Sequence, residues 1–243
     1  MSDAVIQVDD ASVAYRIRFG ATSSLKETII NTLKRKNSDV EIKALRGISF
    51  QVNKGETLAV IGRNGAGKST LLKLLSRVLP PTTGRVIVRG SVAPMIELGA
   101  GFNPELTGRE NIVLYGTLLG RKPAEMRERA GEIAQWAELN EFIDLPLRTY
   151  SSGMAAKLAF ATATDSTSEI ILIDEILSVG DAAFVEKSKS RINQILKGDA
   201  AVVLVSHDEV AIKRIATHAL WLDHGKVIAY GEVDAVLDAY RNG

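Results

Sequence analysis

The sequence predicts an α/β fold: a mainly parallel sheet with helices on both faces, an antiparallel β layer beside it, and an inserted helical segment. Three observations favour this fold. Short apolar runs of strand character at 57–62, 170–173 and 201–205 are separated by helical stretches, as in a parallel sheet. Residues 5–18 have a β-rich, partly alternating composition that predicts one or two antiparallel strands. Across 107–165 the pattern becomes helical instead.

The composition bounds the classes of function. The chain has 243 residues, enough to bury a full core, and fits one elaborated domain better than two. Its net charge of +1 does not indicate a nucleic-acid partner. The absence of cysteine excludes disulfides and thiol chemistry, and three scattered histidines do not suggest a metal cluster. Because no apolar run approaches the roughly 18 residues that span a bilayer, and no N-terminal signal is present, we expect a cytoplasmic protein whose membrane role comes through a partner.

The N-terminal third leaves two interpretations open. Tyr15, near the end of the first β-rich stretch, either stacks on an adenine or packs as an ordinary strand residue. A capping box at 24–27 then begins a predicted helix with one apolar face and a basic end at 34–36. This helix either contacts anionic lipid headgroups or a membrane-embedded partner, or packs its apolar face on its own domain. Residues 48–52 predict the strand that leads, through a turn, into the apolar run at 57–62.

A glycine-rich loop follows that apolar run and precedes a helical stretch. It satisfies the phosphate-binding pattern G-x-x-x-x-G-K-[ST] in full, over Gly62, Arg63, Asn64, Gly65, Ala66, Gly67, Lys68, Ser69 and Thr70. Glycines let successive backbone N–H groups point at a phosphate, and the new helix adds the positive end of its dipole. We expect Lys68 to reach the β and γ phosphates and the Ser69 hydroxyl to ligate Mg²⁺. The alternative is a chance glycine-rich turn, which the strand, loop and helix order disfavours.

The elements beyond the loop follow in order. Strand-like stretches at 85–90 and 92–96 come after a turn at 80–84, and 99–104 predicts a flexible loop that carries contacts. Periodicity within the inserted segment predicts three helices, at 109–119, 124–139 and 153–163. The last third predicts a helix, a strand, a turn, a strand and a closing helix, at 209–216, 219–222, 223–225, 226–230 and 233–241.

Polar side chains end two of the buried strands. Asp174 and Glu175 follow the run at 170–173, and His207 lies just beyond 201–205. Phosphoryl transfer to water needs Mg²⁺, a group that positions the water, and a contact at the γ-phosphate. We assign Asp174 to the Mg²⁺ shell, Glu175 as general base or water-positioning group, and His207 to the γ-phosphate. The alternatives are a surface turn for the carboxylates and a structural role for His207, the role we expect for the other two histidines, at 218 and 224.

Further motifs run along almost the whole chain. The stretch Tyr150-Ser151-Ser152-Gly153-Met154 resembles the signature sequence of ABC ATPases, in the variant of the nucleotide-binding subunits that export lipid-linked polysaccharides such as O-antigen lipopolysaccharide, teichoic acid and galactan. Stretches that agree with this branch lie at 97–111, 174–181 and 205–208. The resemblance implies a P-loop, RecA-like core with the helical subdomain at roughly 105–165, forming a single ATP-binding domain over 1–243 without a C-terminal carbohydrate-binding domain.

The resemblance also implies roles for residues that match its motifs. Tyr15 matches the aromatic residue that stacks on adenine, Glu175 the catalytic glutamate and His207 the switch histidine. Two copies would meet head to tail, with each ATP between one copy's phosphate loop and the other's Ser151, Ser152, Gly153 and Met154. The stretch Gly180-Asp181 would cross the interface between the copies.

One position departs from the general pattern. Most ABC ATPases carry a glutamine that contacts Mg²⁺ and couples to the membrane subunit, where this chain has Glu97. Polysaccharide exporters share this feature, so we expect Glu97→Gln to keep ATP hydrolysis.

The sequence therefore predicts an ATPase subunit, with ATP and Mg²⁺ bound, that is peripheral on the cytoplasmic face of the inner membrane. Its expected partners are a membrane-embedded permease, a second copy of itself and, through the permease, a lipid-linked polysaccharide, with no nucleic acid. Two alternatives remain: an ABC exporter of another substrate, and a soluble ABC ATPase. The second is disfavoured because the chain lacks a long coiled-coil insertion and a tandem nucleotide domain.

Overall fold

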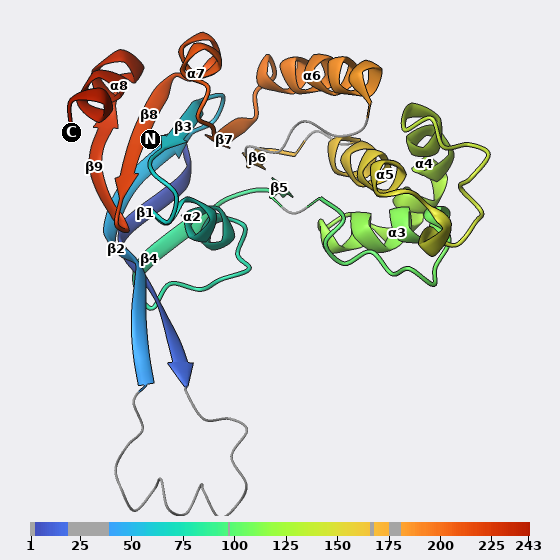
Figure 1. Cartoon of the computed structure of the whole chain (residues 1–243), viewed down its shortest axis with the longest axis horizontal. Coiled ribbons are helices and arrows are strands. Elements are labelled where there is room, and N and C mark those ends of the chain that lie inside the picture. Colours follow the sequence, from blue (N-terminus) through green and yellow to red (C-terminus); the bar gives the residue numbers. More distant parts are fainter. Residues whose placement is uncertain (1–2, 19–38, 97, 166–167, 175–180) are drawn as a thin grey trace, which may run out of the picture.

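The structure, a computed structural model, describes residues 3–18, 39–96, 98–165, 168–174 and 181–243. It has the predicted α/β architecture, with a six-stranded sheet in the order β5-β6-β7-β3-β8-β9 and a three-stranded sheet in the order β2-β1-β4 (Figure 1). The strands are β1 (Ala4–Arg18), β2 (Asp39–Asn53), β3 (Thr57–Ile61), β4 (Thr83–Val88), β5 (Val92–Met95), β6 (Ile170–Ile173), β7 (Ala201–Val205), β8 (His218–Asp223) and β9 (Lys226–Gly231). The helices are α2 (Lys68–Leu75), α3 (Gly108–Leu118), α4 (Pro123–Trp136), η1 (Leu147–Thr149), α5 (Ser152–Thr164), α6 (Ala182–Leu196), α7 (Glu209–Ile215) and α8 (Val233–Asn242).

The six-stranded sheet is parallel except for β9, which pairs antiparallel with β8. Every residue of β3, β6 and β7 is buried, which explains why each strand is a continuous apolar run. Strand β3 lies between β7 and β8, so Val60 is opposite both Val205 and Leu220. The carboxyl ends of β3, β6 and β7 consequently meet at one edge of the sheet.

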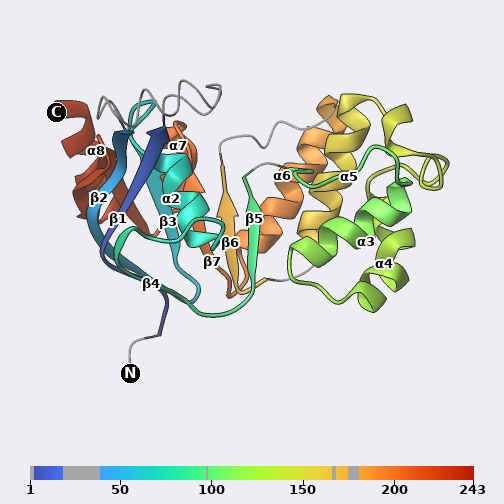
Figure 2. The same ribbon diagram turned by 90° about the horizontal axis from the view of Figure 1, so that it is seen from below.

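Helices cover both faces of this sheet. Figure 2 shows α2 on one side of β5–β7, and α5 and α6 on the other. Leucines of α2 and residues of the antiparallel layer share a core with one set of sheet side chains, which includes Leu172 and Val203. The opposite set, which includes Ile171 and Val202, packs against Phe160 of α5 and other side chains of the second core.

The antiparallel layer differs in extent from the prediction. Strand β1 is one continuous strand with several register shifts, and β2 begins at Asp39 where the sequence predicted only 48–52. The added part of β2 pairs with the distal half of β1, and its side chains Val40 and Ile42 are 43% and 46% exposed. Val40, Ile42 and Ala44 alternate with Glu41 and Lys43, so this stretch carries a strand pattern that the prediction of 48–52 left out.

Helices α3, α4 and α5 pack together at the end of the molecule opposite β1, β2 and β4 (Figures 1 and 2). Thr107 begins α3 with a capping box, since its hydroxyl accepts from the Glu110 N–H while the Glu110 carboxylate accepts from the Thr107 N–H. Helix α4 ends at Trp136, three residues before the predicted end at 139. The chain leaves the helix through Glu138, whose φ is 62°, and the Leu139 N–H donates to the Ala134 carbonyl, as in a Schellman motif.

Candidate functional site

The phosphate loop joins β3 to α2 at the edge where the three buried strands end. Gly62 has φ 148°, and a Cβ at this position would lie 2.1 Å from the Leu222 carbonyl oxygen of the neighbouring strand. Gly65 has φ 81°, yet no described atom lies within 4 Å of where its Cβ would be. The first glycine is therefore required by packing beneath the loop, whereas the second leaves space on the loop's open side.

Lys68 is the first residue of α2 and is only 9% exposed. Its ammonium donates to the Gly62 carbonyl at 2.6 Å and to the Arg63 carbonyl at 3.1 Å. These bonds fold the side chain back along its own loop, which places a buried positive charge beside the backbone amides. An anion at the loop would meet this charge and the positive end of the α2 dipole together.

A cavity of about 470 Å³ lies over this loop. Its lining joins three strand ends: phosphate-loop residues after β3, Asp174 after β6 and His207 after β7. The loop residues that line it are Asn64, Gly65, Gly67, Lys68, Ser69 and Thr70. The other three loop residues face elsewhere: Gly62 packs under Leu222, Ala66 is 3% exposed, and Arg63 lines a separate cavity with Trp221 and Tyr240.

The cavity's polar groups suit a nucleotide with Mg²⁺. Ser69 and Asp174 both line it, and they offer a hydroxyl and a carboxylate. Among the described residues, no group of three or more His, Cys, Asp or Glu side chains is placed to hold a metal alone. One carboxylate and one hydroxyl are the donor set for a cation that takes its other ligands from phosphate and water, which is how Mg²⁺ is usually bound.

Several predicted residues lie away from this cavity. Tyr15 is 38% exposed on β1, opposite Ile42, which does line the cavity; Tyr15 itself does not, although the structure describes it. Glu175, Glu97, Gly180 and the predicted helix that begins with the capping box at 24–27 lie outside the described residues.

The signature stretch is likewise separate from the cavity. Ser151 caps α5, and its hydroxyl accepts from the Met154 N–H at 3.1 Å. Ser151 and Ser152 are exposed, and Gly153 and Met154 are half-buried. All four residues are described, and none lines the cavity over the phosphate loop. This chain therefore has two polar helix N-termini: the start of α2, which lines the cavity, and the start of α5, which does not.

The structure adds residues that the sequence did not indicate. Lys43, Ala44 and Arg46 of β2 line the cavity, as does His224, for which we expected a structural role. His224 has φ 45° in the turn between β8 and β9. The next residue, Gly225, donates to the Ala66 carbonyl and accepts from the Arg46 N–H, so this turn is wedged between β2 and the phosphate loop. No local sequence signal predicts the arrangement, because it depends on β8 lying beside β3.

Charged side chains connect α5 to its neighbours near its middle and at its C-terminal end. Lys157 donates to the Asp181 carboxylate at 2.6 Å, and Asp181 also caps α6 by accepting from the Phe184 N–H. The Lys157 bond first, and the helix cap second, lower the pKa of Asp181 to about 2. At the far end of α5, Arg129 binds Asp165 through two hydrogen bonds, which raise the pKa of the guanidinium.

Comparison with known proteins gives consistent results. The family model described as "ABC transporter" matches residues 45–178. The O-antigen export system ATP-binding protein RfbB of Myxococcus xanthus is 43% identical over 244 residues, which cover 98% of this chain and 56% of that protein. The Klebsiella pneumoniae protein of the same name is 44% identical over 198 residues, covering 82% of this chain and 80% of that protein. The teichoic acids export ATP-binding protein TagH of Lactococcus lactis is 43% identical over 198 residues, covering 82% of this chain and 42% of that protein.

Solved structures support the fold. A structure described as the ATP binding subunit of an ABC transporter matches with a TM-score of 0.71 at 23% identity, covering 98% of this chain and 93% of that one. An ATP-binding cassette solved as a dimer in a post-hydrolysis state with ADP and phosphate matches with a TM-score of 0.69 at 22% identity, covering 94% of this chain and 98% of that one.

Proposed function

The chain belongs to the ABC transporter family, and we propose that it is the ATP-hydrolysing subunit of an exporter that moves a lipid-linked polysaccharide across the cytoplasmic membrane. The observation that carries the ATPase assignment is the cavity in which the phosphate loop, Asp174 and His207 meet. The substrate class is supported by the relatives, which are named for the export of O-antigen and of teichoic acids.

Each group around the cavity has a task in ATP hydrolysis. The amides of the phosphate loop and the Lys68 ammonium bind the β and γ phosphates. Ser69 and Asp174 hold Mg²⁺, which when bound neutralises charge on the phosphate oxygens. His207, just past the end of β7, contacts the γ-phosphate. Glu175, beyond the described residues, orients the attacking water and accepts its proton.

The base of the nucleotide is assigned to the β2 side of the cavity. Tyr15 would stack on the adenine from β1, the strand paired with β2. Tyr15 is partly exposed and pairs with Ile42, which lines the cavity. Lys43 and Arg46 add positive charge to the same wall.

The exposed end of α5 accounts for the other half of the site. Ser151 and Ser152 offer hydroxyls, and Ser152 and Gly153 offer backbone amides at a helix start, which suit a γ-phosphate; the Met154 amide already donates to the Ser151 hydroxyl. In this chain they are turned away from the cavity, so we assign them to the nucleotide of a second copy paired head to tail. ATP would then hold the two copies together, and hydrolysis would release them.

The transported molecule would cross through a different subunit. Among the described residues, no helix is long and apolar enough to traverse a membrane. Because the relatives are named as ATP-binding proteins of export systems, we propose a permease partner embedded in the inner membrane, with this chain peripheral on its cytoplasmic face.

The ATPase assignment is tested with purified protein and the Glu175→Gln variant. We expect ATP binding to be kept and steady-state hydrolysis to fall by at least about 10²-fold, the usual contribution of a general base. The matched control is Glu169→Gln, since Glu169 lies just before β6 while Glu175 lies beyond its other end. Equal loss in both variants, or full activity in Glu175→Gln, would contradict the assignment.

The substrate class is tested in the cells that make the protein, by replacing it with Glu175→Gln. The expected result is a surface depleted of one glycan, with the lipid-linked form of that glycan accumulating inside. Unchanged surface and internal glycans, together with a disturbance of another solute, would leave the ATPase assignment standing and refute the polysaccharide.

A further inference from the structure

Helix α5 carries unusually little bulk for a helix at the centre of a core. Seven consecutive residues, 158–164, are buried; all but Leu158 and Phe160 are alanine or threonine, and Phe160 is the one aromatic side chain that interlocks with its neighbours, Trp136 and Phe184. Its side chains enter two separate core clusters, one against the sheet and one against α3 and α4. Small side chains make shallow ridges, so packing alone fixes the position of such a helix along its own axis less firmly than interlocking large side chains do.

A buried charge stands at the C-terminal end of this helix. Asp165 is the C-cap residue of α5, and its side chain is 6% exposed. A carboxylate at a helix C-terminus meets the negative end of the helix dipole, and burial adds a further penalty for the charge. Asp165 is therefore stable there only with cations beside it.

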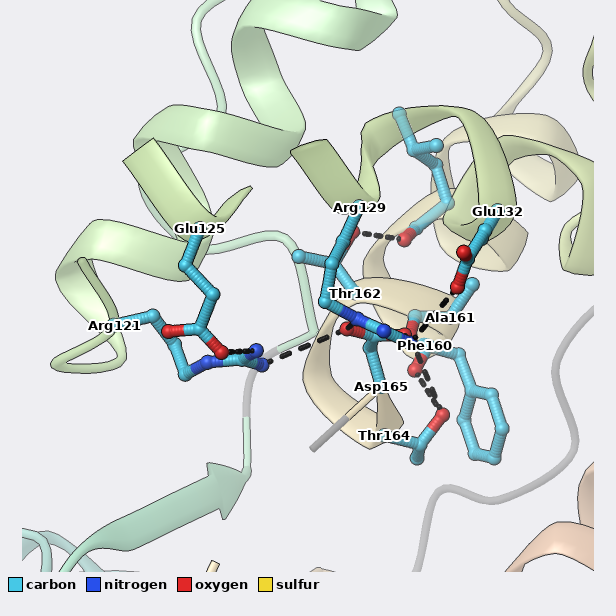
Figure 3. A network of polar contacts seen from close by, with 10 residues as sticks. Arg121, Glu125, Arg129, Glu132, Phe160, Ala161, Thr162, Thr164 and Asp165 are labelled. Carbon is cyan, nitrogen blue, oxygen red and sulfur yellow. Dashed lines mark hydrogen bonds and ion pairs between the residues drawn. The ribbon is translucent and has the colours of Figure 1, made fainter. Parts of the chain in front are cut away.

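Two arginines from the neighbouring chain segment supply those cations (Figure 3). Arg129 of α4 approaches Asp165 with its planar fork: Nε donates to Oδ2 at 2.5 Å and Nη2 donates to Oδ1 at 2.8 Å. Arg121, which precedes α4, places Nη1 3.7 Å from Oδ2. Glu125 and Glu132 bind the outer sides of Arg121 and Arg129, respectively, which holds both guanidinium groups in place.

The two-bond geometry fixes the relative orientation of the guanidinium and the carboxylate as well as their distance. A guanidinium and a carboxylate in a parallel fork share a plane, so sliding α5 along its axis would break both bonds at once. The second tie, made by Lys157 near the middle of α5, is of a different kind, because its partner Asp181 is 61% exposed and forms no fork. The fork joins the buried Asp165 carboxylate to Arg129, whose side chain is 39% exposed, and it is the firmer of the two ties on the helix.

We propose that Asp165, held by Arg129, is a positioning residue that fixes α5 along its axis and thereby sets where Ser151 to Met154 meet the nucleotide of a second copy. This inference rests on the two-copy site proposed above. The fork is 13 residues from the helix start and contacts no part of the cavity over the phosphate loop. The fork affects only the α5 half of the site. Its loss should therefore leave ATP binding by a single chain unchanged and weaken the ATP-dependent pairing of two chains.

The test uses Arg129→Lys, which keeps a cation beside Asp165 but removes the fork. The matched control is Arg109→Lys, since Arg109 makes the same two-bond fork, at 2.8 and 3.1 Å, but with Asp144, which is not part of α5, and with side chains 45% and 71% exposed. Both changes are placed in a Glu175→Gln chain, in which ATP persists. We measure ATP affinity of the single chain by titration at low protein concentration, and ATP-dependent self-association by sedimentation velocity.

The expected result for Arg129→Lys is an ATP affinity within about twofold of the parent and self-association weakened by about tenfold or more, since a misplacement of about 1 Å in such a site can reduce its effectiveness by 10²-fold. Arg109→Lys should match the parent in both. A parallel fall in affinity and association in Arg129→Lys, or identical association in both variants, would overturn the inference.

A second measurement reports on α5 without requiring two copies. The Trp136 ring of α4 stacks on Phe160 of α5 with a centroid distance of 5.7 Å, and the chain has two tryptophans. In a Trp221→Phe background, Arg129→Lys should shift Trp136 emission and Arg109→Lys should not. If the parent chain never associates with ATP, the two-copy site is refuted; if Trp136 emission is unmoved in Arg129→Lys, the positioning role itself is refuted.

Discussion

The phosphate-loop face and the start of α5 are the two halves of the proposed nucleotide site, and they are held in place by different means. The phosphate loop is fixed by backbone: it follows a fully buried strand, its first glycine touches the neighbouring strand, and the turn between β8 and β9 closes on it. The start of α5 is exposed, and its helix is tied by ion pairs, Lys157 with Asp181 and Asp165 with Arg129. The half formed by the phosphate loop is fixed by backbone contacts within one chain. The position of the other half depends on the ion pairs of α5, so substitutions of those charged residues can alter it.

The largest effect is expected when the positive charge of Lys68 is removed from the phosphate-loop half of the site. Lys68→Ala should lower ATP hydrolysis by about 10² to 10³-fold, the size found when one group that stabilises a transition state is removed. Stability should fall by about 2 kcal/mol, because the charged hydrogen bonds to the Gly62 and Arg63 carbonyls are lost. Steady-state ATPase rates of Lys68→Ala and of Lys73→Ala, further along the same helix, make the comparison. Hydrolysis within tenfold of the parent in Lys68→Ala would break the assignment of this half.

The next effect separates packing from binding inside the same loop. Gly62→Ala should destabilise the fold by about 3 kcal/mol, because a Cβ 2.1 Å from the Leu222 oxygen forces the backbone to move. Gly65→Ala should lower stability by only about 1 kcal/mol, the strain of a left-handed backbone, while still weakening ATP binding since Gly65 lines the cavity. Urea unfolding and ATP titration of both variants check this. An equal stability loss in the two would show that the loop's contact with β8 does not constrain it.

The third prediction compares the Arg129–Asp165 pair at the end of α5 with the more exposed Arg109–Asp144 pair. Arg129→Ala should lower the free energy of unfolding by about 2 kcal/mol, below the usual cost of breaking a buried pair because Arg121 still faces Asp165. Arg109→Ala removes an equally well-formed fork from solvent and should change stability by only about 0 to 1 kcal/mol. Urea denaturation of both single variants measures the difference. If Arg109→Ala has the greater effect, burial of Asp165 is not what makes the fork at α5 matter.

The sequence could predict the parts of the site that depend on local motifs but not those that depend on contacts between distant segments. The phosphate loop is local, and parallel strands bring their carboxyl ends together, so the sequence alone was enough to place Asp174 and His207 beside it. The cavity wall from Lys43 to Arg46 and His224 could not be predicted, because it depends on the turn between β8 and β9 packing against a strand far earlier in the chain; the alternation at 40–44 indicates a strand but not what packs against it. The pairing of Arg129 with Asp165 spans 36 residues, and nothing in either segment marks one arginine among several.

The smallest effect concerns the other tie of α5 and tests whether it is electrostatic. Asp181 has a pKa of about 2 in the folded chain against an ordinary 3.8, chiefly because of its bond with Lys157. The ionised carboxylate therefore stabilises the fold fully above pH 3.8, and this contribution is lost as the pH falls from 3.8 through about 2. In Asp181→Asn the amide oxygen still accepts from the Phe184 N–H, but the ion pair is gone. The stability difference between parent and variant, from urea unfolding, should be constant from pH 7 to 5 and shrink toward pH 2.

Because Asp181 is 61% exposed, the difference should also shrink in about 1 M salt, where screening acts within about 3 Å. A difference that stays the same at low pH and in salt would mean that Asp181 acts only as a helix cap. The ion pairs of Asp165 with Arg129 and Arg121, and of Lys157 with Glu138, would then be the electrostatic ties left between α5 and its neighbours among the described residues.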